Sequence, residues 1–218
     1  FAVFGYAHVP WMKARQRLID GANLPDTPVR AAMAALVSDR LVAAGYVRVG
    51  LDHYARPDDA LAKAAESGRL RRSFQGYVAE TQPSVIGLGA SSISSLPAGY
   101  TQNAPDARRY GTTIEAGSFA TVRGLALTDA DRLRGEVIER LMCSCAVDLG
   151  EICRRHAVAP QGFIDGIEDL PALLDDGVVR LDGERLFVTE RGRQLVRFVC
   201  AAFDPHLAHT DGRHSRGI

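Results

Sequence analysis

The sequence has few cysteines, no long apolar run and no net charge, and each shortage removes a class of protein. Nowhere do about 18 consecutive apolar residues occur, which argues against a membrane-spanning helix. The formal net charge is zero, so composition gives no support to a general attraction to nucleic acid or anionic lipid. No charged leader with a cleavage site is present, so we predict no secretory signal. The chain instead opens at Phe1 within an apolar run, which predicts the interior of a longer protein.

The four cysteines do not form a common metal-binding motif. Cys143, Cys145, Cys153 and Cys200 match neither a paired C-x-x-C zinc site nor a ferredoxin run. The first three fall on helical patterns, where a free cysteine usually behaves as a small buried hydrophobe. We therefore expect reduced, buried thiols, which together with the missing leader predict a cytoplasmic protein.

The first half of the chain alternates between strand and helix patterns. Residues 1–10 are predicted as a strand, and residues 27–44 as a helix with Thr27 as its N-cap and Pro28 in its first turn. A short strand at "YVRVGL", a short helix at "ARPDDALAKAAESG" and a buried strand at "SVIGLGASSIS" follow. This alternation predicts parallel βα units. Helical spacing predicts that one apolar stripe of the long helix is its buried face: Met33, Leu36, Val37, Leu41 and Ala44.

The second half has the pattern of three helices, a hairpin and a final helix. A capped amphipathic helix begins at about Thr128, and "VDLGEICRRH" and "IEDLPALLDDG" predict two further helical segments. Asp182-Gly183 predicts a tight hairpin turn, and a helix that ends near Phe203 closes the pattern. This order is typical of a winged-helix domain. We predict two domains, residues 1–115 and residues 116–218.

Polar side chains stand at the ends of two predicted strands, where parallel βα arrays bind ligands. Tyr6 and His8 follow the first strand, and Asp52 and His53 follow the second. Asp52 could orient the imidazole of His53 for acid–base chemistry. Alternatively, Tyr6 fills the core, His8 bonds locally, Asp52 caps a turn and His53 lies on the surface. The residues alone leave both interpretations open.

Two further segments carry weaker signals. Gln75 in "FQGY" offers an amide that can both donate and accept, and Gly76 beside it allows close approach of a backbone. Gly87 and Gly89 have G-x-G spacing without the third glycine and the ordered context of a dinucleotide fingerprint. No Ser-His-Asp triad, zinc-protease helix or P-loop can be assembled from this sequence.

Six blocks in a fixed order resemble one enzyme family. They are "GYAHVP", "GLDHYARPDDALAKA", "FQGY", "GLGASSISS", "YTQN" and "RGLALTDADRLRGEVIERLMC". Together they resemble oxygen-independent coproporphyrinogen III oxidase, from the first residues to about Phe203. The resemblance implies an α/β fold: the C-terminal part of an incomplete radical-SAM (β/α) barrel, followed by a mostly helical, winged-helix-like domain.

The resemblance also implies a reaction and its cofactors. Such enzymes decarboxylate two propionates of coproporphyrinogen III oxidatively to vinyl groups, which gives protoporphyrinogen IX in anaerobic haem biosynthesis. They use S-adenosylmethionine and a [4Fe-4S] cluster. Carried over by position, Ala7 and Ile93 match residues that contact S-adenosylmethionine, and Gln75 matches a polar position near that cofactor. No catalytic residue is assigned.

One departure from the family pattern limits what this chain can do by itself. The C-x-x-x-C-x-x-C motif that holds the family's cluster is missing, so we expect a fragment that assembles no cluster and is inactive alone. The full-length enzyme is expected to be a cytoplasmic monomer with no nucleic-acid or membrane partner. The alternatives are a related haem chaperone, and a nucleic-acid-binding winged-helix protein suggested by residues 128–203.

Overall fold

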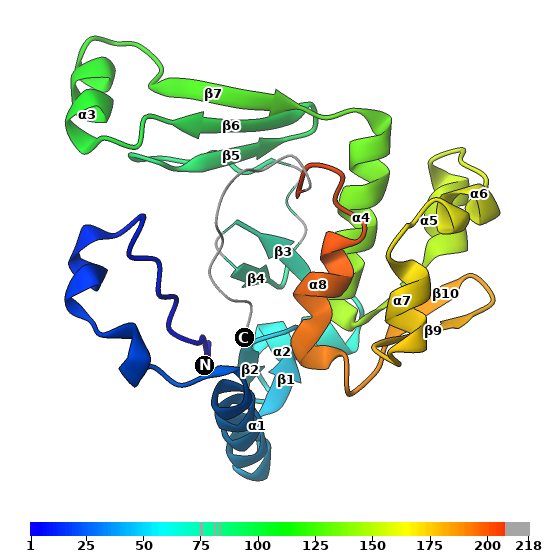
Figure 1. Ribbon diagram of the computed structural model, residues 1–218. Helices are drawn as coiled ribbons and strands as arrows, with labels where there is room; N and C mark the ends of the chain where they lie inside the picture. Colours follow the sequence, from blue (N-terminus) through cyan, green and yellow to red (C-terminus); the bar gives the residue numbers. More distant parts are fainter. Residues whose placement is uncertain (75, 81, 83, 208–218) are drawn as a thin grey trace.

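The computed structural model describes residues 1–74, 76–80, 82 and 84–207 (Figure 1). It is built from short strands and helices, with the long helix α4 (Asp129–Ser144) near its centre (Figure 1). One side of α4 packs on a small hairpin from the first half of the chain, and the other packs on the helices that follow it. The same helix therefore joins the two halves.

The amino-terminal segment is a coil, and the predicted strand at residues 1–10 is wrong. Its one bridge among the described residues is antiparallel and joins Ala2 to His53. Two short 3-10 helices follow, η1 (Ala14–Leu18) and η2 (Gly21–Asn23). A strand needs a neighbouring strand to satisfy its backbone groups, and the described residues supply only this bridge.

Helix α1 (Thr27–Ala43) is confirmed, but its cap and its buried face differ from the prediction. The N-cap is Asp26, one residue before Thr27, because the Asp26 carboxylate accepts a 3.0 Å hydrogen bond from the Val29 amide. Met33 and Leu36 are 55% and 56% exposed, so they do not form the buried face. Val37 and Leu41 of the predicted stripe are half-buried, and the helix packs along β1 (Val47–Val49).

The strands of the first half pair in antiparallel hairpins, so the predicted parallel βα units are wrong. Strand β1 pairs with β2 (His53–Ala55), and β3 (Arg71–Ser73) pairs with β4 (Gly76–Val78). Helix α2 (Ala60–Glu66) connects the two hairpins and begins at the Asp59 N-cap. The reason for the error is that strand–helix alternation is a local pattern, whereas strand pairing depends on distant segments.

A three-stranded antiparallel sheet in the order β5-β6-β7 follows, at the top of Figure 1. The predicted buried strand at "SVIGLGASSIS" is reduced to β5, which is half-buried, and Ile86 and Leu88 before it are exposed. Asn103 holds that glycine-containing segment as a loop by donating to the carbonyls of Gly87 and Gly89 at 3.0 and 3.1 Å. The elements are β5 (Ile93–Leu96), β6 (Gly99–Asn103), α3 (Ala107–Glu115) and β7 (Thr121–Ala126).

The second half confirms the predicted helices and hairpin. The Thr128 hydroxyl and the Asp131 carboxylate form a capping box at the start of α4. The hairpin turns at Asp182-Gly183, and a third strand, which the pattern did not predict, completes an antiparallel sheet in the order β8-β10-β9. The remaining elements are β8 (Ala146–Asp148), α5 (Leu149–Arg155), α6 (Pro160–Asp165), α7 (Leu170–Asp175), β9 (Val179–Asp182), β10 (Arg185–Val188), η3 (Arg193–Leu195) and α8 (Val196–Ala201).

Two hydrophobic clusters form the core, and α4 contributes to both. The larger lies within residues 133–203 and includes fully buried Leu141, Leu186 and Phe203. The smaller includes Val49 and Tyr77 and takes Cys143 from α4. The division into residues 1–115 and 116–218 stays a prediction. Strand β7 lies after the predicted boundary and pairs with β6 before it.

Candidate functional site

The turn between β1 and β2 positions the Asp52–His53 pair that the sequence analysis singled out. Gly50 has φ +60°, in the left-handed region, and a Cβ there would lie 2.1 Å from Cζ of Tyr77. Only glycine allows the chain to turn so close to that ring. Asp52 and His53 follow immediately, with His53 opposite Val49 in the register of the hairpin.

Asp52 and His53 form a hydrogen-bonded pair, as the orienting interpretation predicted. Asp52 Oδ1 lies 2.8 Å from His53 Nδ1, and the two side chains are 10% and 19% exposed. An ionised carboxylate can only accept, so Nδ1 carries the hydrogen of this bond. His53 Nε2 points toward β4, 3.7 Å from where a Cβ on Gly76 would lie. The carboxylate thus sets the tautomer and direction of the imidazole.

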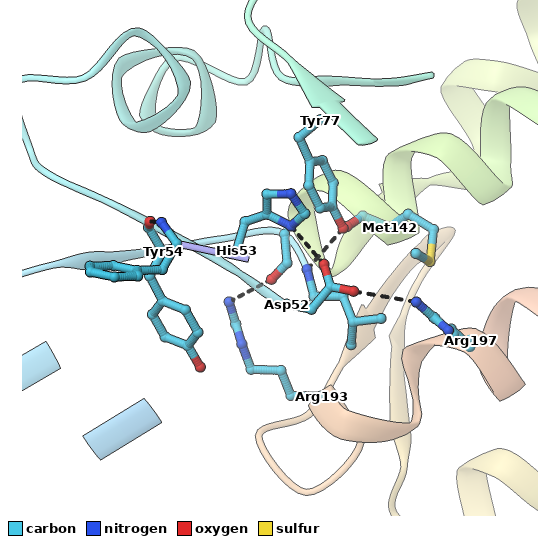
Figure 2. Close-up of polar contacts among 10 residues, drawn as sticks. Asp52, His53, Tyr54, Tyr77, Met142, Arg193 and Arg197 are labelled. Atoms are coloured by element: carbon cyan, nitrogen blue, oxygen red, sulfur yellow. Dashed lines mark hydrogen bonds and ion pairs between the residues drawn. The ribbon is translucent and has the colours of Figure 1, made fainter. Parts of the chain in front are cut away.

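Two arginines from the end of the chain complete this pair (Figure 2). Arg197 of α8 donates to Asp52 Oδ2 at 3.3 Å, and Arg193 of η3 donates to the Gly50 carbonyl at 3.4 Å. Both oxygens of the Asp52 carboxylate are therefore engaged, one by an imidazole and one by a guanidinium. The sequence analysis missed both arginines, because nothing local links them to a turn more than 140 residues earlier.

Tyr77 lies behind the pair and joins it to α4 (Figure 2). Its hydroxyl accepts from the Leu51 amide and donates to the Met142 carbonyl, both at 2.9 Å. The edge of its ring meets the His53 ring at 4.9 Å between centroids, and the Arg72 guanidinium lies 4.7 Å from its centroid. Burial raises the pKa of Tyr77, which keeps the hydroxyl protonated and able to donate.

A cavity of about 460 Å³ borders His53 on the side of the amino-terminal coil. The coil runs along β2 there, because the Tyr54 amide donates to the Phe1 carbonyl and the Val3 amide donates to the Asp52 carbonyl, both at 2.8 Å. The cavity is lined by Phe1, Ala2, Tyr46, His53, Tyr54, Ala55, Arg56, Asp59 and Leu61. The mixture of aromatic and charged lining residues suits a partly apolar ligand or a segment of polypeptide.

The residues carried over from the family resemblance fall on separate elements. Ala7 is exposed in the coil, and its carbonyl accepts a 3.0 Å hydrogen bond from the Gln16 amide group. Ile93 is half-buried at the start of β5 and pairs with Gln102. Gln75 lies outside the described residues. The assignment of these three positions to a cofactor site stays a prediction.

Tyr6 and His8 contact each other in the same coil. The Tyr6 hydroxyl lies 3.4 Å from His8 Nδ1, which agrees with the local-bonding interpretation of His8. Tyr6 is 45% exposed, so it does not fill the core. Their proposed contact with a ligand stays a prediction.

The cysteines do not fit an iron–sulfur cluster. Burial raises the pKa of Cys143 and that of Cys200 to about 12, and it also raises the pKa of Cys145 and Cys153. Cluster ligands must be thiolates, and such thiols resist deprotonation. Among the described residues, no group of three or more His, Cys, Asp or Glu side chains could hold a metal ion. No described helix is long and apolar enough to cross a membrane.

Comparison with known proteins finds this chain similar to one part of longer enzymes. The family model described as "HemN C-terminal domain" matches residues 127–195. An oxygen-independent coproporphyrinogen III oxidase of Bradyrhizobium diazoefficiens is 49% identical over 218 residues, which are 100% of this chain and 48% of that protein. A protein of the same name from Paracoccus denitrificans is 40% identical, again over 100% of this chain and 48% of its own length.

The structural comparison agrees with the sequence comparison. A solved structure titled "Coproporphyrinogen III oxidase (HemN) from Escherichia coli is a Radical SAM enzyme" matches with a TM-score of 0.87 and 35% identity. The match covers 94% of this chain and 48% of that chain, which confirms the predicted fold class as one part of such an enzyme. The chain thus spans about half the length of its relatives. By sequence and by structure, the chain is similar to the carboxyl-terminal half of the oxygen-independent coproporphyrinogen III oxidases.

Proposed function

We propose that this chain is the carboxyl-terminal part of an oxygen-independent coproporphyrinogen III oxidase. The observation that carries the proposal is the 49% identity to an enzyme of that name along all 218 residues. The substrate would be coproporphyrinogen III, and the product would carry two vinyl groups in place of two propionates. The complete protein would act in the cytoplasm as a monomer without nucleic acid.

The cofactors of the complete protein would be S-adenosylmethionine and a [4Fe-4S] cluster. The cluster would be held outside this chain, because the sequence has no C-x-x-x-C-x-x-C motif and no described group of cysteines could hold a metal ion. Ile93 would offer an apolar wall to the adenosine and Ala7 a small side chain beside it, since both positions match cofactor-contacting residues of the family. Gln75 would supply an amide hydrogen bond near the same cofactor.

Asp52, His53 and Arg197 would act as a positioning group in the proposed enzyme. Arg197 and Tyr77 tie the β1–β2 turn to α8 and α4, and Asp52 directs the imidazole toward the start of β4. The group would therefore hold the β3–β4 hairpin, which carries the "FQGY" block, in a fixed orientation.

The test is a chimera in which this chain replaces the matched part of the Bradyrhizobium diazoefficiens protein. Under anaerobic conditions, with S-adenosylmethionine and a reductant, we expect it to convert coproporphyrinogen III to a divinyl product. Ile93→Asp should raise the apparent Kd for S-adenosylmethionine by about tenfold, because a charge would border the adenosine. Val122→Asp, at an exposed site on the same sheet, is the matched control and should not change that Kd.

The outcomes separate the proposal from its alternatives. A folded chimera that binds S-adenosylmethionine and forms no vinyl product would overturn the oxidase assignment, and haem binding by that chimera would favour the related chaperone. Salt-dependent binding of duplex DNA by this chain would favour the nucleic-acid-binding alternative.

A further inference from the structure

Helix α1 has an apolar stripe of which only one edge is covered. Val37 and Leu41 are half-buried at the edge nearer β1, along which the helix packs. Val29, Met33 and Leu36 continue the stripe at helical spacing and are 49%, 55% and 56% exposed. The apolar stripe of a helix normally faces a packed partner. Among the described residues, this part of the stripe lacks such a cover.

The amino-terminal coil extends this exposed surface. Phe4 and Tyr6 are 65% and 45% exposed, and the glycine between them lies against α1. A Cβ on Gly5 would be 2.6 Å from Nη2 of Arg30. Coil and helix are thus neighbours, and we call the surface formed by Phe4, Tyr6, Val29, Met33 and Leu36 the α1 face.

Large apolar side chains are exposed at this end of the described residues and also between residues 74 and 125, where Leu88 and Phe119 are 83% and 94% exposed. Trp11, Met12 and Leu18 of the coil and η1 are also exposed. Residues 128–207 contrast with this, because their large apolar side chains are mostly buried around Leu141 and Phe203. The α1 face is therefore one part of the apolar surface that residues 1–125 expose, and it is set apart because its side chains lie on one helix and on the coil beside it.

The relatives carry further polypeptide that this chain does not match. This chain aligns along its whole length with 48% of the Bradyrhizobium diazoefficiens protein, so about as much polypeptide again is unmatched. We propose that the α1 face is the docking surface for polypeptide equivalent to that unmatched part. The inference rests on the proposed function only for the identity of the occupant, and its test does not use enzymatic activity.

The experiment is hydroxyl-radical footprinting, which modifies exposed Met, Phe and Leu side chains, on this chain alone and within the chimera. In the chain alone, Met33 and Leu36 should be modified rapidly and the buried Met142 slowly. Because oxidation follows exposure, we expect the rate at Met33 to fall by about tenfold in the chimera. Leu207, which is 41% exposed in the carboxyl-terminal region, is the internal control and should keep its rate.

A double variant supplies the second measurement. Met33→Glu with Leu36→Glu should lower the thermal midpoint of the chimera and leave that of the chain alone nearly unchanged, since both side chains are exposed there. Val158→Glu, 40% exposed between α5 and α6, is the matched control and should lower neither midpoint. Unchanged modification of Met33 in a folded chimera would overturn the proposal. Dimers of this chain that the double variant abolishes, with no protection in the chimera, would assign the face to self-association and also overturn it.

Discussion

At the scale of single residues, the β1–β2 turn depends on Gly50 having no side chain, because the Tyr77 ring fills the space beside it. The ring of Tyr77 occupies the place where a Cβ on Gly50 would lie, and Gly50 also has a positive φ. The same ring packs against His53, whose direction Asp52 sets. A change at Gly50 therefore reaches the candidate site through Tyr77.

Gly50→Ala is expected to lower the free energy of unfolding by about 3 kcal/mol, from backbone strain together with displacement of the Tyr77 ring. Gly68→Ala is the matched control, because Gly68 has φ +66° and nothing within 4 Å of an added Cβ. This control should lower the free energy of unfolding by only about 1 kcal/mol, from backbone strain alone. Urea denaturation followed by circular dichroism measures both, and equal losses would contradict the role of Tyr77.

At the scale of elements, α4 is the helix whose start is most completely capped. The Thr128 amide donates to Asp131 Oδ2 at 2.9 Å, and His206 Nε2 lies 2.8 Å from Asp131 Oδ1. These hydrogen bonds, the one from the Thr128 amide foremost, lower the pKa of Asp131 from 3.8 to about 2. The first turn of α4 is thus linked to His206, beyond α8, through one carboxylate.

The lowered pKa of Asp131 predicts that the thermal stability of the protein depends on pH. Because the pKa of Asp131 is lower in the folded state, its stabilisation is complete above the ordinary value of 3.8 and is lost as the pH falls toward about 2. Asp131→Asn should therefore reduce the loss of thermal stability across that window. Asp129→Asn, at an exposed position in the same turn, should leave the loss as in the parent chain. Identical pH profiles for all three proteins would refute the link.

At the scale of the whole molecule, Tyr77 and Arg197 connect the early hairpins to the helical second half. Tyr77 bridges Leu51 and Met142, and Arg197 reaches Asp52 from α8. Helix α4 also contributes to both hydrophobic clusters, with Met142 in the larger and Cys143 in the smaller. The candidate site consequently lies at the junction of the two halves, and its geometry depends on their docking.

Tyr77→Phe is expected to lower the free energy of unfolding by about 2 kcal/mol, because a backbone amide and a carbonyl would lose their shared partner. Tyr6→Phe is the control, since the Tyr6 hydroxyl is exposed and its contact with His8 Nδ1 is long, at 3.4 Å. It should change the stability by less than about 0.5 kcal/mol. Calorimetry compares the two variants, and a similar small loss in both would contradict a bridging role for Tyr77.

A structural feature of this molecule could be predicted from the sequence when the residues that form it lie close together along the chain. The α4 cap and the Asp182-Gly183 hairpin were predicted correctly, and the Asp52–His53 pair was one of two interpretations left open, because each depends on residues close together in the chain. Arg193 and Arg197 were missed, because they reach the β1–β2 turn only after the second half has folded onto the first. The proposed cofactor contacts of Ala7, Ile93 and Gln75 remain predictions.

By itself, the sequence indicated the family resemblance, the helical pattern of the second half and the burial of Cys143 and Cys153, because block order, periodicity and side-chain polarity are properties of the chain. Cys145, which was also expected to be buried, is only half-buried. Only the tertiary structure decided that the strands pair in antiparallel hairpins and that Met33 and Leu36 face outward. Both depend on which distant segment lies alongside an element, and local patterns contain no information about a partner that lies far along the chain or outside it.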